Sequence, residues 1–378
     1  MKNKITLSNP HLSGKELDYI KQAFNTNQVS NFGENIINFE KQLEKYLGQN
    51  SNVACLSSGT AAIHLALIMA GVKNGDEVIC QSMTFSASVN PIIYLGAKPI
   101  FIDSETSTWN MCPLYLEEAI IDRISRGTKP KAIVLVHLYG MPAKLEEIVA
   151  IAKKYEITLI EDAAEALGST YKNQKCGTFA DYGILSFNGN KIITTSGGGA
   201  LITKSPKTKE KVLFLATQAR DYAPHYQHSE IGYNYRMSNV LAGIGRAQIE
   251  VINNYVELRR SNKDFYKSIF KDLEAITVFE EPNSDYFSNH WLSCIVIESE
   301  IAGFNREDLR LNLLRSNIES RPLWKPMHLQ PIFEKFPFYG GNVSEDIFKK
   351  GLCLPSGSNL TKKDKEFISK TLNSYLNS

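Results

Sequence analysis

Short apolar runs alternate along the chain with stretches in which apolar residues recur every three or four positions. Five runs in the first half have the length of single strands: 52–56, 77–81, 98–103, 131–139 and 157–162. Four stretches have the spacing of amphipathic helices: 14–24, 36–47, 113–124 and 143–155. Uninterrupted apolar strands that alternate with such helices predict a parallel sheet covered on both faces, and ligands of these sheets bind beyond the carboxyl ends of the strands.

The pattern becomes less regular after residue 220. Residues 221–239 are polar, aromatic and irregular, and this segment is too long to be a simple connection. Residues 239–270 predict one long helix. The rest of the chain predicts a strand, two helices and a proline-broken loop: 290–299, 306–317, 363–376 and 319–333.

Length and composition are those of a two-domain globular protein. The chain has 378 residues, of which 43% are apolar, and this is enough for a substantial core. We predict an α/β protein with a large domain over residues 1–250, in which the central sheet is mostly parallel. A smaller C-terminal α/β domain is predicted over residues 251–378.

Charge and cysteine usage argue against several classes of partner. The net charge is +2 and no run of five or six like charges occurs, so neither nucleic acid nor an anionic membrane is indicated. The start, MKNKITLSNP, has no apolar stretch behind it, and no run of 18 apolar residues could span a bilayer. We expect a cytoplasmic protein. The six cysteines lack ligand spacing, so we expect reduced thiols and no metal site.

One lysine has an unusual sequence context. Lys191 lies between the strand-like run 182–187 and the glycines 197–199, among Ser, Asn and Thr. Small side chains pack closely, and glycines let the backbone approach a ligand. A desolvated lysine amine is a nucleophile toward an aldehyde. Schiff-base chemistry with pyridoxal phosphate is therefore the first hypothesis, and a solvated surface lysine is the alternative.

Pyridoxal phosphate also needs an acid for its ring nitrogen, a phosphate site and a face to stack on. Asp162 closes the run 157–162, where a buried acid must be paired. Residues 57–60, Ser-Ser-Gly-Thr, join a strand to a helix, which is a geometry that binds phosphate; simple helix capping is the alternative. Phe85 follows another strand and can offer a ring face, with core packing as the alternative.

At these residues the sequence resembles a family, the pyridoxal-phosphate-dependent nucleotide-sugar aminotransferases of the DegT/DnrJ/EryC1/StrS group, which have fold type I. The resemblance covers nearly the whole chain. Seven separated motifs carry it in family order: SSGTAAIHLAL, TFSASVNPIIYLGAKPIFIDSETSTWNM, EDAAEALGS, SFNGNKIITTSGGGAL, GYNYRMSN, RPLWKPMHLQP and CLPSGSNL.

The resemblance implies roles around the cofactor. Lys191 would bind the cofactor covalently and then act as general base and acid. Asp162 would keep the pyridine nitrogen protonated, and Glu165 would lie near the phenolic oxygen, where family members often have Gln or His. Five further contacts are implied: Gly59, Thr60 and Ser186 at the phosphate, Phe85 on the ring, and Asn234 at the phosphate of the neighbouring subunit. The active unit would then be a homodimer with shared active sites.

The resemblance also implies a substrate site and a reaction. Arg321, Trp324, Lys325 and His328 would face the sugar nucleotide near the dimer interface. L-glutamate would give its amino group to the cofactor and leave as 2-oxoglutarate, and a 4-keto sugar would then become a 4-amino sugar. Family relatives that dehydrate sugars carry histidine in place of the lysine, so Lys191 favours transamination.

Within the family, SETSTWNM, HYQHSEIGYNYR and RPLWKPMHLQP are most similar to enzymes of the UDP-N-acetylbacillosamine pathway and to dTDP-viosamine 4-aminotransferases. We therefore expect a UDP- or dTDP-linked 4-keto-6-deoxy glucose-type sugar as substrate and a 4-amino-4,6-dideoxy sugar as product. O-antigen, surface polysaccharide or protein glycosylation would be the use. A GDP-perosamine-type synthase stays open.

Two other classes share part of the pattern. A dinucleotide-dependent oxidoreductase would need GxGxxG after the first strand, and the Ser-Ser-Gly-Thr turn lacks that spacing. A non-catalytic regulator that binds sugar nucleotides with the same fold would need a recognition element, and no basic DNA-binding segment occurs. The aminotransferase is favoured over both.

Overall fold

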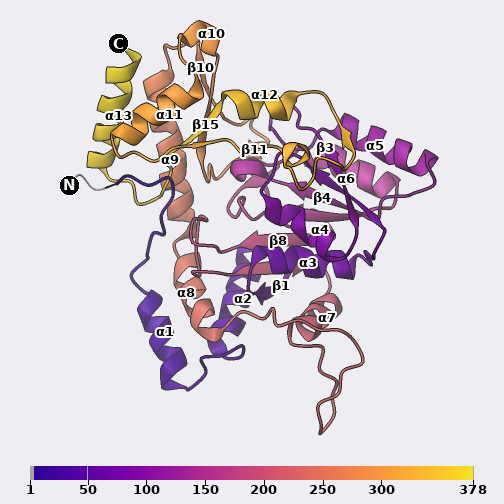
Figure 1. The fold of residues 1–378 in the computed structure, drawn as a ribbon. Coiled ribbons are helices and arrows are strands. Elements are labelled where there is room, and N and C mark those ends of the chain that lie inside the picture. Colours follow the sequence, from indigo (N-terminus) through magenta and orange to yellow (C-terminus); the bar gives the residue numbers. More distant parts are fainter. Residues whose placement is uncertain (1–3, 49, 378) are drawn as a thin grey trace.

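The structure, a computed structural model, describes residues 4–48 and 50–377. Its centre is an eight-stranded sheet in the order β1-β9-β8-β5-β4-β2-β3-β14 (Figure 1). The strands are β1 (Asn52–Leu56), β2 (Glu77–Gln81), β3 (Lys98–Ile102), β4 (Ala132–Val136), β5 (Thr158–Asp162), β8 (Tyr182–Ser186), β9 (Gly199–Thr203) and β14 (Phe338–Tyr339). β9 is antiparallel to both of its neighbours and the other pairs are parallel, so the predicted mostly parallel sheet is confirmed.

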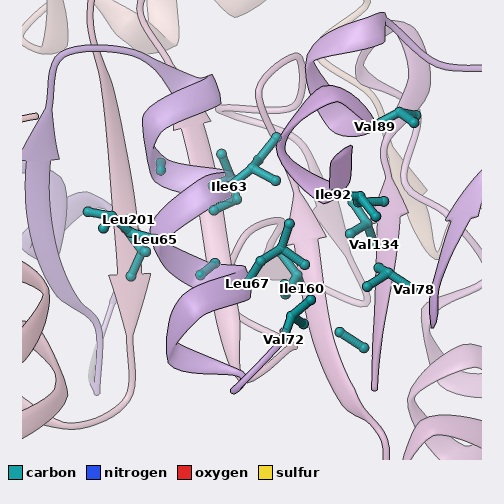
Figure 2. Packing of buried hydrophobic residues seen from close by; sticks show 14 of the residues in the cluster. Ile63, Leu65, Leu67, Val72, Val78, Val89, Ile92, Val134, Ile160 and Leu201 are labelled. Carbon is teal, nitrogen blue, oxygen red and sulfur yellow. The ribbon is translucent and has the colours of Figure 1, made fainter. Parts of the chain in front are cut away.

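Helices cover both faces of this sheet. On one face lie α3 (Gly59–Met69), α4 (Asn90–Tyr94) and α7 (Pro206–Ala216). On the other lie α2 (Glu34–Leu47), α5 (Pro113–Ser125), α6 (Leu145–Lys154) and α8 (Asn239–Ile249). Figure 2 shows the first of these cores, where Leu67 of α3 lies beside Ile160 of β5. Neighbouring residues of β4, Ile133 and Val134, belong to opposite cores, as expected of a strand buried on both faces.

A second, antiparallel sheet belongs to the C-terminal part of the chain. Its strands, in order, are β10 (Ile276–Val278), β12 (Ser293–Ile297), β15 (Gly351–Leu354) and β13 (Arg321–Pro322). The helices beside it are α9 (Ile252–Phe270), α10 (Ser299–Ala302), α11 (Arg306–Arg315) and α13 (Lys362–Leu376). Ile5 pairs with Ile318 and is buried in this C-terminal core, whereas β14 joins the large sheet beside β3. Each end of the chain therefore contributes to a core formed mainly by the other end.

The remaining elements are two helices, a small three-stranded sheet and three 3₁₀ turns. They are α1 (Glu16–Asn25), α12 (Val343–Lys350), the sheet of β11 (Tyr286–Phe287), β6 (Thr170–Tyr171) and β7 (Gln174–Lys175), and the 3₁₀ turns η1 (Ser86–Ser88), η2 (Leu138–Gly140) and η3 (Met327–Leu329). In the part of the chain that the structure describes, no helix combines the length and the apolar character that crossing a membrane requires. All six cysteines are free thiols.

The prediction of one helix over 239–270 is wrong, because the structure has two. α8 ends at Ile249 and α9 begins at Ile252, with Val251 at φ −112° and ψ 7° between them. Neither glycine nor proline marks this break. Glu250 is held instead by Lys15, directly before α1, whose Nζ is 2.9 Å away, and by Tyr19 in α1, whose Oη is 2.5 Å away. These partners are far away in the sequence, so apolar spacing alone did not locate the break.

Candidate active site

A cleft of about 700 Å³ opens beyond the carboxyl ends of the parallel strands. Residues at or just after the ends of four strands line it: Ser57 after β1, Val136 in β4, Asp162 in β5 and Ser186 in β8. Parallel strands place their carboxyl ends on one edge of the sheet, which is why residues from distant parts of the chain meet there. The cleft lies where the strand pattern predicted a ligand site.

Lys191 lies in this cleft and is largely buried. Its side chain is 11% exposed, so the alternative of a solvated surface lysine is wrong. The amine Nζ is 3.1 Å from Glu165 Oε1 and 4.1 Å from the centre of the Trp291 ring. Trp291 Nε1 donates to the Asn190 carbonyl oxygen at 2.8 Å, which fixes the ring beside the lysine loop. Sequence reasoning missed Trp291, whose only signal was an aromatic residue just before a strand.

Glu165 is held from two sides. Its Oε2 accepts the Tyr139 backbone N–H at 2.7 Å, while Oε1 faces Lys191. Tyr139 has φ 54°, an unusual conformation for a bulky residue, and it directs this amide at the carboxylate. Burial raises the pKa of Glu165, and Lys191 and the Tyr139 amide oppose that rise. The carboxylate is therefore a fixed anchor for the lysine amine.

Asp162 closes β5 and is 4% exposed. Its Oδ2 accepts a hydrogen bond from Ser88 Oγ at 2.8 Å, and its Oδ1 accepts the Ala164 N–H at 3.1 Å. Burial raises the pKa of Asp162, and these two hydrogen bonds, followed by the charge of Lys191, oppose the rise. A buried carboxylate in a cleft wall is stabilised by any cation that docks beside it. Sequence reasoning identified Asp162 but not Ser88.

The turn before α3 provides amide donors. Ser58 Oγ accepts the Ala61 N–H at 3.0 Å, which caps the helix. The amides of Gly59 and Thr60 precede the first intrahelical donors and face the cleft end of the helix. A Cβ on Gly199 would come within 2.4 Å of the Ser58 carbonyl carbon, so glycine lets β9 pack against this turn. Capping and anion binding are thus compatible here, because they use different amides.

Aromatic side chains line the outer wall of the cleft. Phe85 is 55% exposed, which rules out the alternative of core packing. Its ring centre is 5.5 Å from that of Trp324, and both residues line the cleft. Arg321 also lines it and pairs with Glu319 at 2.9 Å.

Three of the predicted site residues do not line the cleft of the single chain. Lys325 is exposed. His328 packs on Phe338, with ring centres 3.8 Å apart, and its Nδ1 is 2.6 Å from Ser82 Oγ. Asn234 is exposed in the segment between α7 and α8. Their predicted contacts with the sugar nucleotide or with a second subunit stay predictions.

Three potential metal ligands meet outside the cleft, at His137, Glu161 and Cys176. His137 Nδ1 accepts the Ala143 N–H at 3.0 Å, so the neutral ring carries its proton on Nε2, which faces Glu161 at 2.7 Å. Glu161 also accepts the Phe179 N–H at 2.9 Å. Donors already occupy the ligand atoms of the histidine and the glutamate, so this cluster is a structural clamp between β4, β5 and the loop after β7.

Comparison with known sequences identifies the family. The sequence profile of the DegT/DnrJ/EryC1/StrS aminotransferase family matches residues 10–373. The chain belongs to this family. It is therefore a sugar aminotransferase of the DegT group, and the resemblance seen in its motifs is confirmed.

Individual relatives of this DegT-family chain agree. EpsN of Bacillus subtilis (strain 168), named provisionally as a pyridoxal phosphate-dependent aminotransferase, is 50% identical over 96% of the chain and 94% of its own length. The GDP-perosamine synthase of Escherichia coli O157:H7 is 37% identical over 98% of each chain. The crystal structure of a DegT/DnrJ/EryC1/StrS aminotransferase from Brucella abortus superposes with a TM-score of 0.89 at 28% identity, over 97% of this chain and 96% of that one. Fold type I is thus confirmed.

The residues in the cleft fit the cofactor on which this family depends. Asp162 is a buried carboxylate that would pair with a protonated ring nitrogen, and Lys191 is an amine fixed on the same wall. The amides of Gly59 and Thr60 suit a phosphate group. An acid, an amine and a phosphate site therefore line the same cleft, and Phe85 on its outer wall offers a ring face.

Proposed function

We propose that this chain binds pyridoxal phosphate through Lys191 and transfers the amino group of L-glutamate to C4 of a nucleotide-linked 4-keto-6-deoxy sugar. The observation that carries this proposal is the meeting of Lys191, Glu165 and Asp162 in one cleft. The amine lies 3.1 Å from Glu165 Oε1, and Asp162 lines the same wall. The overall reaction yields 2-oxoglutarate and a 4-amino-4,6-dideoxy sugar nucleotide.

Bound pyridoxal phosphate supplies an electron-withdrawing ring that stabilises charge at the carbon that loses its proton. Lys191 Nζ removes the Cα proton of the amino donor and later delivers a proton to C4 of the sugar. Glu165 holds Nζ in place between these steps. Asp162 holds a proton on the ring nitrogen through its negative charge. Phe85 would stack on the cofactor ring, and Trp291 and Trp324 provide apolar surface beside the reacting groups.

The nucleotide is the open part of the substrate. The motifs SETSTWNM, HYQHSEIGYNYR and RPLWKPMHLQP are most similar to those of enzymes that use UDP- or dTDP-linked sugars, so these two nucleotides are the first candidates. GDP is the second candidate, because the GDP-perosamine synthase relative is 37% identical over nearly the whole chain. Arg321, Trp324, Lys325 and His328 are proposed to contact the sugar nucleotide, and two of them, Arg321 and Trp324, line the cleft.

We also propose a homodimer in which Asn234 completes the phosphate site of the partner subunit. The segment between α7 and α8 extends away from the sheet in Figure 1. Large apolar side chains that are more than half exposed occur on this segment and near the N-terminus: Tyr222, Tyr226, Ile231, Leu12, Leu17, Phe24, Phe32 and Ile37. A second copy of the chain would bury this surface.

The substrate is tested with purified protein, ¹⁵N-labelled L-glutamate and a panel of UDP-, dTDP- and GDP-linked 4-keto-6-deoxy sugars. Mass spectrometry should find the label in an amino sugar nucleotide, together with stoichiometric 2-oxoglutarate. Conversion of a UDP or dTDP sugar alone supports the first candidates, and conversion of the GDP sugar alone supports the second. Release of 2-oxoglutarate with no labelled sugar from any of the three would contradict the proposed acceptor class.

The site of cofactor attachment is tested separately. Borohydride reduction of the loaded protein followed by peptide mapping should place the pyridoxyl mass on Lys191, because this lysine is held in the cleft wall beside Glu165. Lys175 is a suitable internal control, since it is half-buried but lies outside the cleft. Label on any lysine other than Lys191 would refute the assignment.

A further inference from the structure

The carboxylate of Asp162 is held by a chain of two hydroxyl groups. Ser88 Oγ is 2.8 Å from Asp162 Oδ2, and Thr84 Oγ1 is 2.8 Å from Ser88 Oγ. Thr84 and Ser88 are 0% and 2% exposed, so these contacts are made inside the protein. The other carboxylate oxygen accepts the Ala164 amide.

Proton counting sets the direction of this chain. A hydroxyl group has one proton to donate, and an ionised carboxylate can only accept. Ser88 therefore donates to Asp162 and accepts from Thr84. A protonated Asp162 that kept its proton on Oδ2 would donate to Ser88 Oγ. The Ser88 proton would then lose its acceptor, unless the Thr84–Ser88 hydrogen bond also reversed. The chain of hydroxyl groups thus favours the ionised form of the acid.

Asp162 needs hydrogen-bond donors to stay ionised, because its carboxylate is buried. Burial raises the pKa of Asp162, and the Ser88 hydrogen bond is the largest effect that opposes the rise. The titratable groups near Asp162 are Lys191, whose positive charge favours the ionised carboxylate, Glu165 and Cys80, whose negative charge would oppose it, and His137, whose ring is neutral because Nδ1 accepts the Ala143 N–H. Without Ser88, the Ala164 amide would be the one direct donor to the buried carboxylate among the residues that the structure describes.

We propose that Ser88, held by Thr84, is a positioning residue that keeps Asp162 ionised and directed at the ring nitrogen of the cofactor. This inference rests on the proposed function, because it concerns how that nitrogen is held. Ser88 acts through Asp162 and not by contact with the sugar. Its role is therefore specific to the nitrogen atom of the ring, and this specificity can be measured without assaying turnover.

The test compares two ligands of the cofactor-free full-length protein. One is pyridoxal phosphate, and the other is its carbocyclic analogue, in which a C–H group replaces the ring nitrogen. Titration followed by absorbance gives both affinities. Ser88→Ala should weaken binding of pyridoxal phosphate about tenfold, which corresponds to about 1.4 kcal/mol. It should leave the affinity for the analogue within about twofold, because the analogue makes no bond to Asp162.

Three further variants make the result decisive. Asp162→Asn should show the same discrimination between the two ligands, and Ser344→Ala should change neither affinity, because Ser344 Oγ is a buried hydroxyl without a partner. Thr84→Val removes only the group that holds Ser88, so it should give a smaller loss with the same discrimination. If the Ser88→Ala protein does not fold, the Thr84→Val protein provides the test in its place.

Equal losses for the two ligands would show that the hydroxyl chain has a general structural role, and the proposal would then be wrong. Unchanged affinities would also overturn it. A wild-type protein that binds neither ligand would instead refute the proposed function, and this outcome is visible before any variant is made.

Discussion

At the scale of single residues, the cleft contains two buried acidic groups, Asp162 and Glu165, and Glu165 contacts the amine of Lys191. We propose that Asp162 pairs with the ring nitrogen of the cofactor. Asp162→Asn keeps the shape of the side chain and removes its charge. We expect the rate of amino transfer to fall at least about a hundredfold, because the stabilising charge is lost.

Steady-state kinetics with glutamate and the accepted sugar nucleotide measure this effect, and thermal unfolding checks that the variant is folded. The matched control is Asp181→Asn, since Asp181 accepts the Leu159 amide at the opposite end of β5 and lies outside the cleft. A folded Asp162→Asn protein with full activity would contradict the assigned role.

The sequence predicted the charged residues of the cleft better than the residues that hold them in position. The position of Lys191 and Asp162 in the cleft could be predicted, because a lysine among small residues and an acid that closes a buried strand are local signals. Their catalytic roles stay predictions. Ser88 and Trp291 could not be predicted, because each acts on a partner that is distant in the sequence: Asp162 and Lys191, respectively. Contacts between residues that are distant in the sequence produce no local sequence pattern from which they could be predicted.

At the scale of elements, apolar spacing predicted the parallel strands and most helices, because burial on both faces leaves a continuous apolar run. It failed at the junction of α8 and α9, where Glu250 is held by Lys15, directly before α1, and by Tyr19 of α1. The boundary of the proposed domains at residue 250 falls at this junction. It stays a prediction, since α9 packs at its start with the large-domain core through Tyr255 and at its end with the C-terminal core through Phe270.

The loop before β12 is held by one half-buried carboxylate, that of Glu281. Glu281 contacts Arg260, lies 3.1 Å from His290 Nε2 and accepts the Ser288 amide at 3.2 Å. Burial alone would raise the pKa of Glu281, but the contacts with His290 and Arg260 outweigh it and hold the pKa well below its usual range. Glu281→Gln should lower the free energy of unfolding at pH 7 by about 1–3 kcal/mol.

The sign of the pH dependence follows from the lowered pKa. The stabilisation is complete above the unfolded-state pKa of about 4.3 and is lost as the pH falls toward the folded-state value. Urea unfolding of wild type and Glu281→Gln should therefore give a difference that narrows below about pH 4.3. Glu280→Gln is the control, because Glu280 is more exposed and its pairing with Lys267 should contribute little. A difference that does not vary with pH would contradict this account.

At the scale of the whole molecule, the proposed homodimer predicts complementation between two inactive variants. In the proposed dimer each cleft uses Lys191 of one chain and Asn234 of the other. A mixed dimer of Lys191→Ala and Asn234→Ala chains therefore has both substitutions in one cleft and neither in the other. When equal amounts exchange subunits at random, about half of the dimers are mixed, and each mixed dimer has one intact cleft. About a quarter of all sites should therefore become active.

The control pair is Lys191→Ala with Asp162→Asn, whose lesions affect clefts of their own chains and should restore nothing. Sedimentation of the wild-type protein measures the oligomeric state independently. A fully active monomer would refute the shared site, and complementation by the control pair would show that the restored activity has another origin.

The position of β14 has a consequence for the newly made protein. β14 pairs with β3 in the large sheet, although residues 338–339 are synthesised long after residues 98–102. At typical translation rates, roughly 10 to 50 s pass between the synthesis of β3 and the synthesis of β14, the strand that pairs with its outer edge. During this interval the nascent chain exposes an apolar strand with unpaired amides and carbonyls, which is a template for aggregation. We expect chaperones to bind the emerging chain at this edge, and release to follow only when β14 has left the ribosome.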